Sequence, residues 1–446
     1  MHKKKPRVYY ITILSVVLVA ISVVFVTSYF GNHFIPEQPP QPAEINTPAV
    51  SIEEPEIIEE ADIEPEEEEP PPADTVYSIN ELYPDMTFLM DAFSKRYNSI
   101  AVSFVLFDGD ERDYYTYVYG QKNTQTKQPI DSETKFCVAS LSKIVTVICA
   151  MKLVEEGKLD LDEDITEYLG YRVRNPRFSN TVITTRMLMQ HQSSLNDTNM
   201  YLFRDNKELP ETTERMLKQR VNYAPFQPGT AHHYSGYFAY SVIGLICEII
   251  TEKRFDDFAR EVLFDPLDID AAFLPDNLSD NSNLATLYDG NHEEQRSVRE
   301  QLAQQESRER ISDHDLVGAN LTITPVDYAK ILIMLGNGGT FDDVRILSEA
   351  TVRAIHDANV QGPGYKQGLA TRYQDNDTMP YYKSYWHLGG AWGVNSQYIH
   401  YIGNSPNRGT VIVTTGAGPL YLQSQMIDMC TDLSLIAELI FPVNPT

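Results

Sequence analysis

Apolar side chains recur at the spacing of one helical face in the stretch that follows residue 143. They are Ile144, Val147, Ile148, Met151 and Val154, and Gly157 comes after them as a stop signal. This pattern predicts a helix with a buried face directly after the segment 136–143.

Strand-like alternation of apolar and polar residues occurs near both ends of a long middle region. Residues 101–107 and 114–120 flank Asp108-Gly109-Asp110 and predict a hairpin, while 397–402 and 410–415 predict two more antiparallel strands. The middle, about 159–355, favours helices and loops, and 420–440 predicts a closing helix. We therefore predict an α+β fold: an antiparallel sheet formed by both ends of the domain, flanked by helices, with a mostly helical inserted subdomain.

The N-terminal region carries a different pattern. Residues 8–30 contain no charge and are rich in Val and Ile, so as a helix they would span roughly 30–35 Å. The basic residues lie before them, in 1–7, which predicts a cytoplasmic tail, a single-pass signal-anchor in the cell membrane and an extracytoplasmic remainder. A cleaved signal peptide is the alternative, but this run is longer than usual and ends in Ser28-Tyr29-Phe30.

Composition separates a linker from a folded domain. Between Pro36 and Asp74 there are 14 acidic residues, ten prolines and no Lys or Arg. We expect 31–76 to be a disordered linker and 77–446 to be the folded domain. The net charge of −27 argues against a nucleic-acid partner, because neutralising phosphates needs a basic surface.

Ser140 and Lys143 lie three residues apart, at the predicted start of the helix. Side chains at this spacing share a helical face, so the lysine can lie beside the serine hydroxyl. A serine becomes a nucleophile when a base is near, and a buried, neutral lysine is such a base. The plain alternative is a helix-capping serine with a solvated lysine.

Cysteine and histidine positions give no metal or cofactor site. None of the four cysteines has metal-type spacing, and His232-His233 lack further ligands nearby. Cys137, three residues before Ser140, is a possible second nucleophile, although no base for it is evident.

Three further stretches follow the Ser140 segment in order. They are Met187-Leu188-Met189-Gln190-His191-Gln192-Ser193-Ser194-Leu195, Tyr234-Ser235-Gly236-Tyr237 and His387-Leu388-Gly389-Gly390-Ala391-Trp392-Gly393. In this order and at these separations, from about residue 77 to the C-terminus, the chain resembles the serine beta-lactamase-related family. That family includes class C beta-lactamases, penicillin-binding D-amino-acid carboxypeptidases and related esterases.

The resemblance implies roles for individual residues. Ser140 matches the acylated nucleophile, Lys143 the lysine beside it, and Tyr234 a tyrosine that relays protons to the leaving group. His387 and Gly389 match the third motif, and the N–H groups of Ser140 and Gly390 would form the oxyanion hole. Lys143 would act either neutral, as a base, or charged, by lowering the pKa of Tyr234. We expect His387 to influence both through its charge, and His191 to be a structural hydrogen-bonder.

One departure limits the substrate. The second motif commonly ends in Asn, whose place is taken here by Gly236. This departure leaves the nucleophile in place but puts beta-lactam or D-Ala-D-Ala recognition in doubt.

From the motifs and the N-terminal run together we expect a membrane-anchored serine hydrolase that uses an acyl-serine intermediate. Its substrate would be a small molecule or peptide, an amide or an ester, such as a cell-wall-derived D-amino-acid peptide. The alternatives are a beta-lactamase and a non-catalytic sensor that binds cell-wall fragments or antibiotics. The sequence does not fix the substrate or the oligomeric state.

Overall fold

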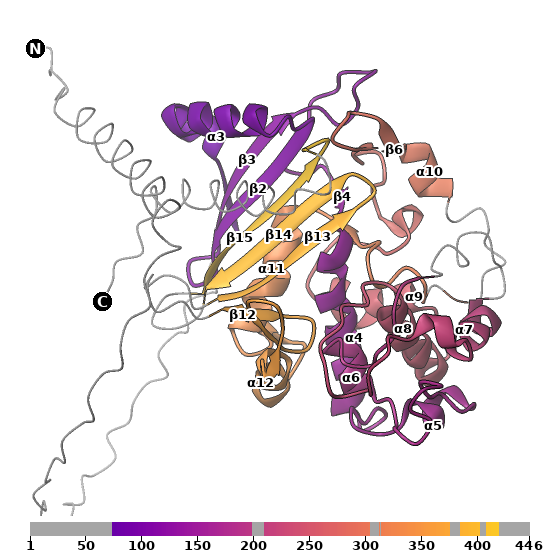
Figure 1. Ribbon diagram of the computed structural model, residues 1–446. Coiled ribbons are helices and arrows are strands. Elements are labelled where there is room, and N and C mark those ends of the chain that lie inside the picture. Colours follow the sequence, from indigo (N-terminus) through magenta and orange to yellow (C-terminus); the bar gives the residue numbers. More distant parts are fainter. Residues whose placement is uncertain are drawn as a thin grey trace, which may run out of the picture. The chain divides into compact units, whose positions relative to one another are not determined.

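A nine-stranded sheet brings the two ends of the domain together, in the order β1-β3-β2-β15-β14-β13-β12-β11-β10 (Figure 1). Its strands are β1 Thr75–Ser78, β2 Ala101–Asp108, β3 Asp113–Gly120, β10 Val360–Gln361, β11 Lys366–Gln367, β12 Arg372–Gln374, β13 Ser384–Ala391, β14 Val394–Tyr401 and β15 Arg408–Thr415. β15 pairs with β2, so the first and last parts of the domain meet inside one sheet, as predicted. The unpredicted strand β1 runs parallel to β3, which makes the sheet mixed rather than purely antiparallel.

The computed structural model describes residues 74–198, 209–303, 312, 314–374, 384–401 and 407–418. These residues belong to one compact unit, Glu69–Thr446. The predicted cytoplasmic tail, membrane anchor and closing helix, and the linker up to residue 73, lie outside the described residues. Within the described ranges, every helix is too short or too polar to cross a membrane.

Short strand pairs and helices complete the fold. The pairs are β4 Phe136–Cys137 with β7 Thr322–Ile323, β5 Leu287–Tyr288 with β6 Glu294–Arg296, and β8 Thr340–Phe341 with β9 Val344–Arg345. The α-helices are α2 Ile79–Leu82, α3 Pro84–Arg96, α4 Ser142–Glu155, α5 Ile165–Leu169, α6 Thr185–Met189, α7 Leu209–Leu217, α8 Phe238–Thr251, α9 Phe255–Ala259, α10 Val298–Ala303, α11 Pro325–Gly336 and α12 Glu349–His356. Single 3₁₀ or π turns are η1 Ala139–Leu141, η3 Arg220–Asn222, η4 Arg260–Phe264 and η5 Pro275–Asn277.

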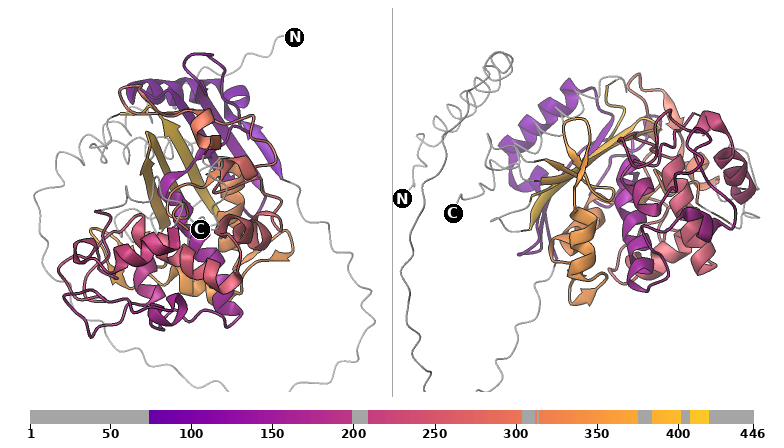
Figure 2. Two further views of the ribbon diagram at one scale, coloured as in Figure 1. Left: turned by 90° about the vertical axis from the view of Figure 1, so that its right-hand side faces the viewer. Right: turned by 60° about the horizontal axis from the view of Figure 1, so that its bottom comes forward.

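The two faces of the sheet are covered by different helices. Phe104 of β2 packs in a cluster with Met90 of α3, whereas its neighbour Val105 joins the larger core that contains α4 and α8. Alternate residues of a strand point to opposite faces, so α3 and the short α2 cover one face, while α4 and α8 cover the other. The right-hand view of Figure 2 separates α3 from those helices. Covering both faces explains why every residue of β2 is buried.

Helix α4 is buried more completely than its one-sided pattern predicts. Eleven of its fourteen residues are buried, including Lys143 and Thr146. The helix lies between the sheet and the helical region, where α8 also packs against it (Figure 1). A helix enclosed in this way is shielded from water on nearly every side. The lysine near its start is therefore enclosed with it.

Candidate active site

A strained turn presents Ser140 at the start of α4. Ser140 lies in η1, and the residue before it, Ala139, has a φ of 49°, a left-handed conformation that costs a residue with a Cβ about 1–2 kcal/mol. Ser142 holds the turn: its Oγ donates to the Ala139 carbonyl at 2.6 Å and accepts from Leu321 N–H at 3.0 Å. Strain of this kind persists where surrounding contacts fix it, and it is frequent at functional sites.

Lys143 lies directly beside the serine. Its Nζ is 3.0 Å from Ser140 Oγ and donates to the Gly318 carbonyl at 2.6 Å, and the residue is fully buried. Burial lowers the pKa of Lys143 to about 7, with Asp197 opposing the shift and Arg372 adding to it. A large fraction of the lysine is therefore neutral near neutral pH, which is the form that accepts a proton from the serine.

Tyr234 completes the cluster from the turn before α8. Its hydroxyl donates to Ser140 Oγ at 3.0 Å, and the Lys143 Nζ lies 5.6 Å from the centre of its ring. The residue keeps 37% of its surface exposed, while its hydroxyl bonds to the serine and its ring lies beside the charged groups of Lys143 and Arg372. Burial raises the pKa of Tyr234, so the phenol stays protonated. Of the two roles considered for Lys143, this favours the neutral base.

His387 lies next to the ring of Tyr234. Its ring centre is 6.3 Å from that of Tyr234, its Nδ1 lies 2.7 Å from the Leu388 carbonyl oxygen, and its buried Nε2 has no hydrogen-bond partner among the described residues. Burial, reinforced by the charges of Arg372 and Lys143, holds the pKa of His387 well below its ordinary value. A neutral imidazole at this position acts through packing and polarity, and not through the charge that the sequence suggested.

The glycines of the third motif allow β13 to approach the nucleophile. A Cβ on Gly389 would lie 2.7 Å from the Val138 carbonyl oxygen and 3.2 Å from the Ala139 Cβ, so a side chain there would push the strand away from η1. Gly390, the next residue, is exposed. Its predicted partner in the oxyanion hole, the Ser140 N–H, belongs to the turn against which Gly389 packs.

Beyond Trp386, one edge of β13 is free. β12 pairs with β13 only from Ser384 to Trp386, whereas β14 pairs with all eight residues of β13. Within the described ranges, residues 387–391 therefore have no strand partner on the side away from β14. An edge of this kind can accept an extended peptide as an added strand.

Asp197 is a site residue that sequence reasoning missed. Its carboxylate accepts from the N–H groups of Gly236 at 2.6 Å and Phe238 at 2.9 Å, and from Ser235 Oγ at 2.8 Å. It thereby caps α8 from another loop and fixes the turn that carries Tyr234. Asp197 lies two residues beyond the motif that ends at Leu195, and nothing in the local sequence signals a contact with such a distant segment.

Arg372 of β12 was also missed. Its guanidinium lies 5.5, 4.7 and 5.2 Å from the ring centres of Tyr234, Tyr365 and Trp386, and its buried Nε has no hydrogen-bond partner among the described residues. Cation–π contacts hold the group in place without neutralising it. The site therefore contains a fixed positive charge next to the proposed proton-relay tyrosine.

Gly236 has a structural reason in this chain. A Cβ there would lie 2.8 Å from Tyr234 Cε1, so the tyrosine could not keep its position. The hydroxyl of Ser235, the residue before Gly236, bonds to Asp197 and to the start of α8. Lys143 is held from another segment, by the Gly318 carbonyl.

The structure also shows what surrounds Cys137 and His191. The Cys137 thiol is buried, donates to the Ala319 carbonyl, and has a pKa raised by burial, which makes it a poor second nucleophile. The backbone of His191 bonds within its turn, but neither buried ring nitrogen has a partner among the described residues. Its ring instead packs against that of Tyr234, with 4.4 Å between the ring centres, and so supports the tyrosine.

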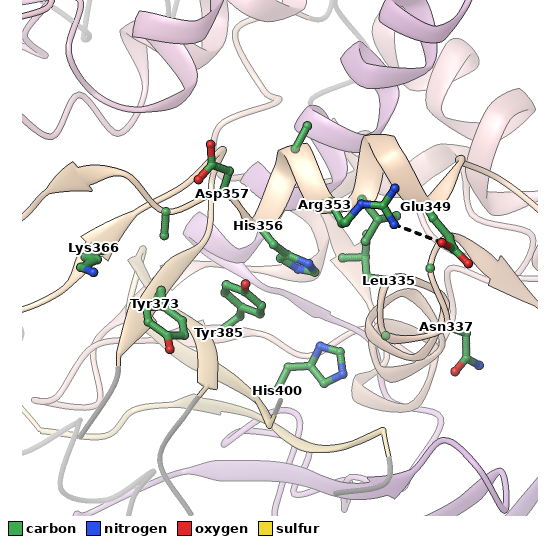
Figure 3. A pocket seen from close by; sticks show the side chains of 15 residues that line it. Leu335, Asn337, Glu349, Arg353, His356, Asp357, Lys366, Tyr373, Tyr385 and His400 are labelled. Carbon is green, nitrogen blue, oxygen red and sulfur yellow. Dashed lines mark hydrogen bonds and ion pairs between the residues drawn. The ribbon is translucent and has the colours of Figure 1, made fainter. Parts of the chain in front are cut away.

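A large cavity lies away from this cluster. It has a volume of about 1080 Å³ and is bordered by α11, α12 and the strand ends that carry Tyr373, Tyr385 and His400 (Figure 3). His356 stacks on Tyr385 at 3.9 Å between ring centres, which makes its wall aromatic. Ser140, Lys143 and Tyr234 are not among the described residues that line it, so the catalytic cluster is identified by its chemistry and not by the size of a cavity.

Solved structures show the same fold. The chain resembles the octameric penicillin-binding protein homologue from Pyrococcus abyssi, with a TM-score of 0.62 and 18% identity over 79% of this chain and 77% of that one. It also resembles the D-amino acid amidase from Ochrobactrum anthropi, with a TM-score of 0.62 and 18% identity over 80% of this chain and 99% of that one.

Curated relatives match over shorter stretches. Protein flp of Staphylococcus aureus is 24% identical over 152 residues, which are 33% of this chain and 30% of that protein. Lovastatin esterase of Penicillium rubens is 28% identical over 169 residues, 33% of this chain and 42% of that protein. The chain thus matches less than half the length of these relatives.

A family model described as Beta-lactamase matches residues 88–423 and so covers most of the chain. That range contains Ser140, Lys143, Tyr234 and His387, and the fold and its order of motifs agree with it. The chain belongs to the beta-lactamase family of serine hydrolases.

Proposed function

We propose that this protein hydrolyses an amide or ester through an acyl intermediate on Ser140. The observation that carries the proposal is the pair of contacts at the serine, where Lys143 Nζ and Tyr234 OH both lie 3.0 Å from Oγ. A neutral lysine and a protonated tyrosine at one hydroxyl provide a base for attack and an acid for departure.

The reaction follows from these positions. Neutral Lys143 takes the proton of Ser140 as Oγ attacks the substrate carbonyl, and the N–H groups of Ser140 and Gly390 stabilise the oxyanion. Tyr234 donates its proton to the leaving nitrogen or oxygen, and the lysine ammonium then reprotonates the tyrosinate, which restores neutral Lys143. Water attacks the acyl-serine and gives one proton to Lys143, and the lysine passes that proton to Ser140 Oγ as the acid is released.

Arg372 supports a substrate with an anionic leaving group. Its guanidinium lies over the ring of Tyr234, the residue that protonates the leaving group, and carries the positive charge described above. We propose that it receives the terminal carboxylate of a peptide, as in a cell-wall-derived D-amino-acid peptide lying along the free edge of β13. The D-amino acid amidase among the similar structures is consistent with this substrate class.

The test combines labelling with turnover. The purified protein is incubated with a fluorophosphonate and a fluorescent penicillin, and then with peptides ending in D-Ala, with a free or an amidated C-terminus. We expect a mass increase on Ser140 and hydrolysis that is lost in Ser140→Ala, with Arg372→Gln lowering kcat/KM for the free acid about tenfold or more and for the amide much less. A lack of both labelling and turnover, with ligand binding that survives Ser140→Ala, would instead identify a binding module.

We also propose that the enzyme is anchored in the cell membrane and faces the extracytoplasmic side. The support is the uncharged run 8–30 between a basic tail and an acidic, proline-rich linker. Protease added to intact cells should remove the catalytic domain, and carbonate washing should leave the protein in the membrane fraction. Recovery of the full-length chain in the soluble fraction would contradict the anchor.

A further inference from the structure

The turn between β13 and β14 contains a residue that its backbone does not favour. Ala391 pairs with Val394, and the two residues between them, Trp392 and Gly393, have φ angles of 50° and 79°. A two-residue hairpin turn with both φ positive favours Asn-Gly, because a bulky side chain is strained there. The backbone does not favour a tryptophan at this position, so contacts of the Trp392 side chain must account for it.

The indole is held by groups from two other segments. The Arg296 guanidinium, from β6, lies 3.5 Å from the centre of the Trp392 ring, and the Tyr237 ring meets it edge-on at 6.4 Å between centres. Arg296 Nη1 in turn donates to Asn320 Oδ1 at 2.8 Å. The ring is thus fixed on one face by a stacked cation, while the residue remains only half-buried.

This aromatic group belongs to the same two segments as the catalytic residues. Trp392 follows the exposed Gly390 by two residues, and Tyr237 follows Tyr234 by three. Arg372 and Trp386 lie at the other end of the free edge of β13, so an arginine stacked on a tryptophan stands at each end, about 20 Å apart along the strand. The serine lies between them, because Gly389 packs on the turn that carries it.

We propose that Trp392, backed by Arg296 and flanked by Tyr237, is a specificity-determining residue that selects substrates with a flat, aromatic or extended apolar acyl group. The inference rests on the proposed function, in which Arg372 and Tyr234 receive the leaving group at one end of the edge. The acyl group then extends toward the opposite end, where the indole and phenol rings offer apolar surface to an aromatic side chain.

The test compares two p-nitrophenyl esters that share a leaving group, the phenylacetate and the acetate. Trp392→Asn should lower the ratio of their kcat/KM values about tenfold, mainly through KM for the phenylacetate. Because Asn-Gly suits this turn, the same variant should melt at an equal or higher temperature. Arg296→Met, which removes the cation behind the ring, should lower the ratio about threefold.

The β8–β9 hairpin supplies a matched control. Its turn residues Asp342 and Asp343 also have positive φ angles, 50° and 60°, between paired Phe341 and Val344. Asp343→Gly should stabilise the protein without changing the ester ratio. If Trp392→Asn keeps the wild-type ratio of kcat/KM values, or if the ratio falls together with the melting temperature, the inference about Trp392 is overturned and the proposed function is not affected. Absence of any acyl-Ser140 with either ester in the wild type would overturn the proposed function together with it.

Discussion

At the scale of single residues, the environment of Lys143 decides which chemistry the site supports. The same Ser-x-x-Lys spacing on an exposed helix would leave a charged lysine that cannot accept a proton. Here α4 is enclosed, and the Gly318 carbonyl and Ser140 Oγ are the hydrogen-bond partners of the ammonium. The spacing suggested a lysine beside the serine, and the structure adds burial that brings the pKa of this lysine close to neutral pH.

The pH dependence of activity follows directly. Burial lowers the pKa of Lys143 to about 7, so the base form grows as pH rises through that value, and kcat/KM should rise with it. Tyr234 has a pKa raised above 10.0, so the rate should remain level to about pH 9. Ester hydrolysis measured from pH 5 to 9 checks this. A rate that falls as pH rises through 7 would exclude the neutral lysine as the base.

The same burial should cost stability. The pKa of Lys143 is lowered from 10.5 to about 7, so the folded protein binds fewer protons than the unfolded chain between these values, and its stability rises with pH across that window. Lys143→Met removes the buried cation and should stabilise the inactive protein by roughly 1–3 kcal/mol at pH 6, after the lost bond to Gly318 is discounted. Urea unfolding at pH 6 and pH 9 should show a smaller gain at pH 9.

The site residues that lie in compact sequence motifs were predictable, whereas those contributed by distant segments were not. Ser140, Lys143 and Tyr234 were selected from their motifs, and the structure brings all three together. Asp197 and Arg372 could not be found in this way, because a carboxylate that caps a distant helix and an arginine placed by strand pairing have no local spacing to reveal them.

At the scale of elements, α8 depends on a cap from outside its own segment. Its N-cap residue Tyr237 provides no side-chain hydrogen bond, and Asp197 binds the free N–H groups instead. The carboxylate therefore joins the 196–198 loop, the Tyr234 turn and the helix into one unit. β12 provides the opposite charge through Arg372. The two elements thus place charges of opposite sign around the same lysine.

Removing the charge of Asp197 and removing the charge of Arg372 should shift the pH profile of kcat/KM in opposite directions. Asp197 raises the pKa of Lys143 and Arg372 lowers it, so Asp197→Asn should shift the acid limb of kcat/KM to lower pH and Arg372→Gln to higher pH. The shifts should each be about 0.5 to 1 pH unit for charges at this range in a partly buried site. Profiles with an uncharged ester substrate check the prediction, since Arg372 then has no substrate carboxylate to bind. Shifts of the same sign would contradict it.

At the scale of the molecule, the fold class was predictable and the exact start of the domain was not. The alternating stretches near both termini predicted a shared sheet, and β2 beside β15 confirms that prediction. The sequence placed the domain start at residue 77, whereas β1 begins at Thr75 and Asp74 pairs with Arg112 at 2.8 Å. A four-residue strand next to a proline-rich linker is too short for a periodicity signal, and its pairing with β3 is a tertiary contact.

That boundary permits a test of the molecule as a whole. A chain that begins at Glu69 keeps Asp74 and β1, so it should hydrolyse the probe ester within about twofold of the full chain. A chain that begins at Tyr77 loses the Asp74 bridge to Arg112 and half of β1, and should melt roughly 3 °C lower.

Both truncated chains lack the uncharged run 8–30 and should be recovered in the soluble fraction, whereas the full chain should sediment with membranes. Thermal melts, ester turnover and ultracentrifugation of the three chains test the start of the folded domain separately from the membrane anchor. An inactive Glu69 chain would show that the preceding segment takes part in folding or catalysis. Soluble recovery of the full chain would refute the anchor, and would leave the hydrolase unaffected because its site is built within residues 139–393.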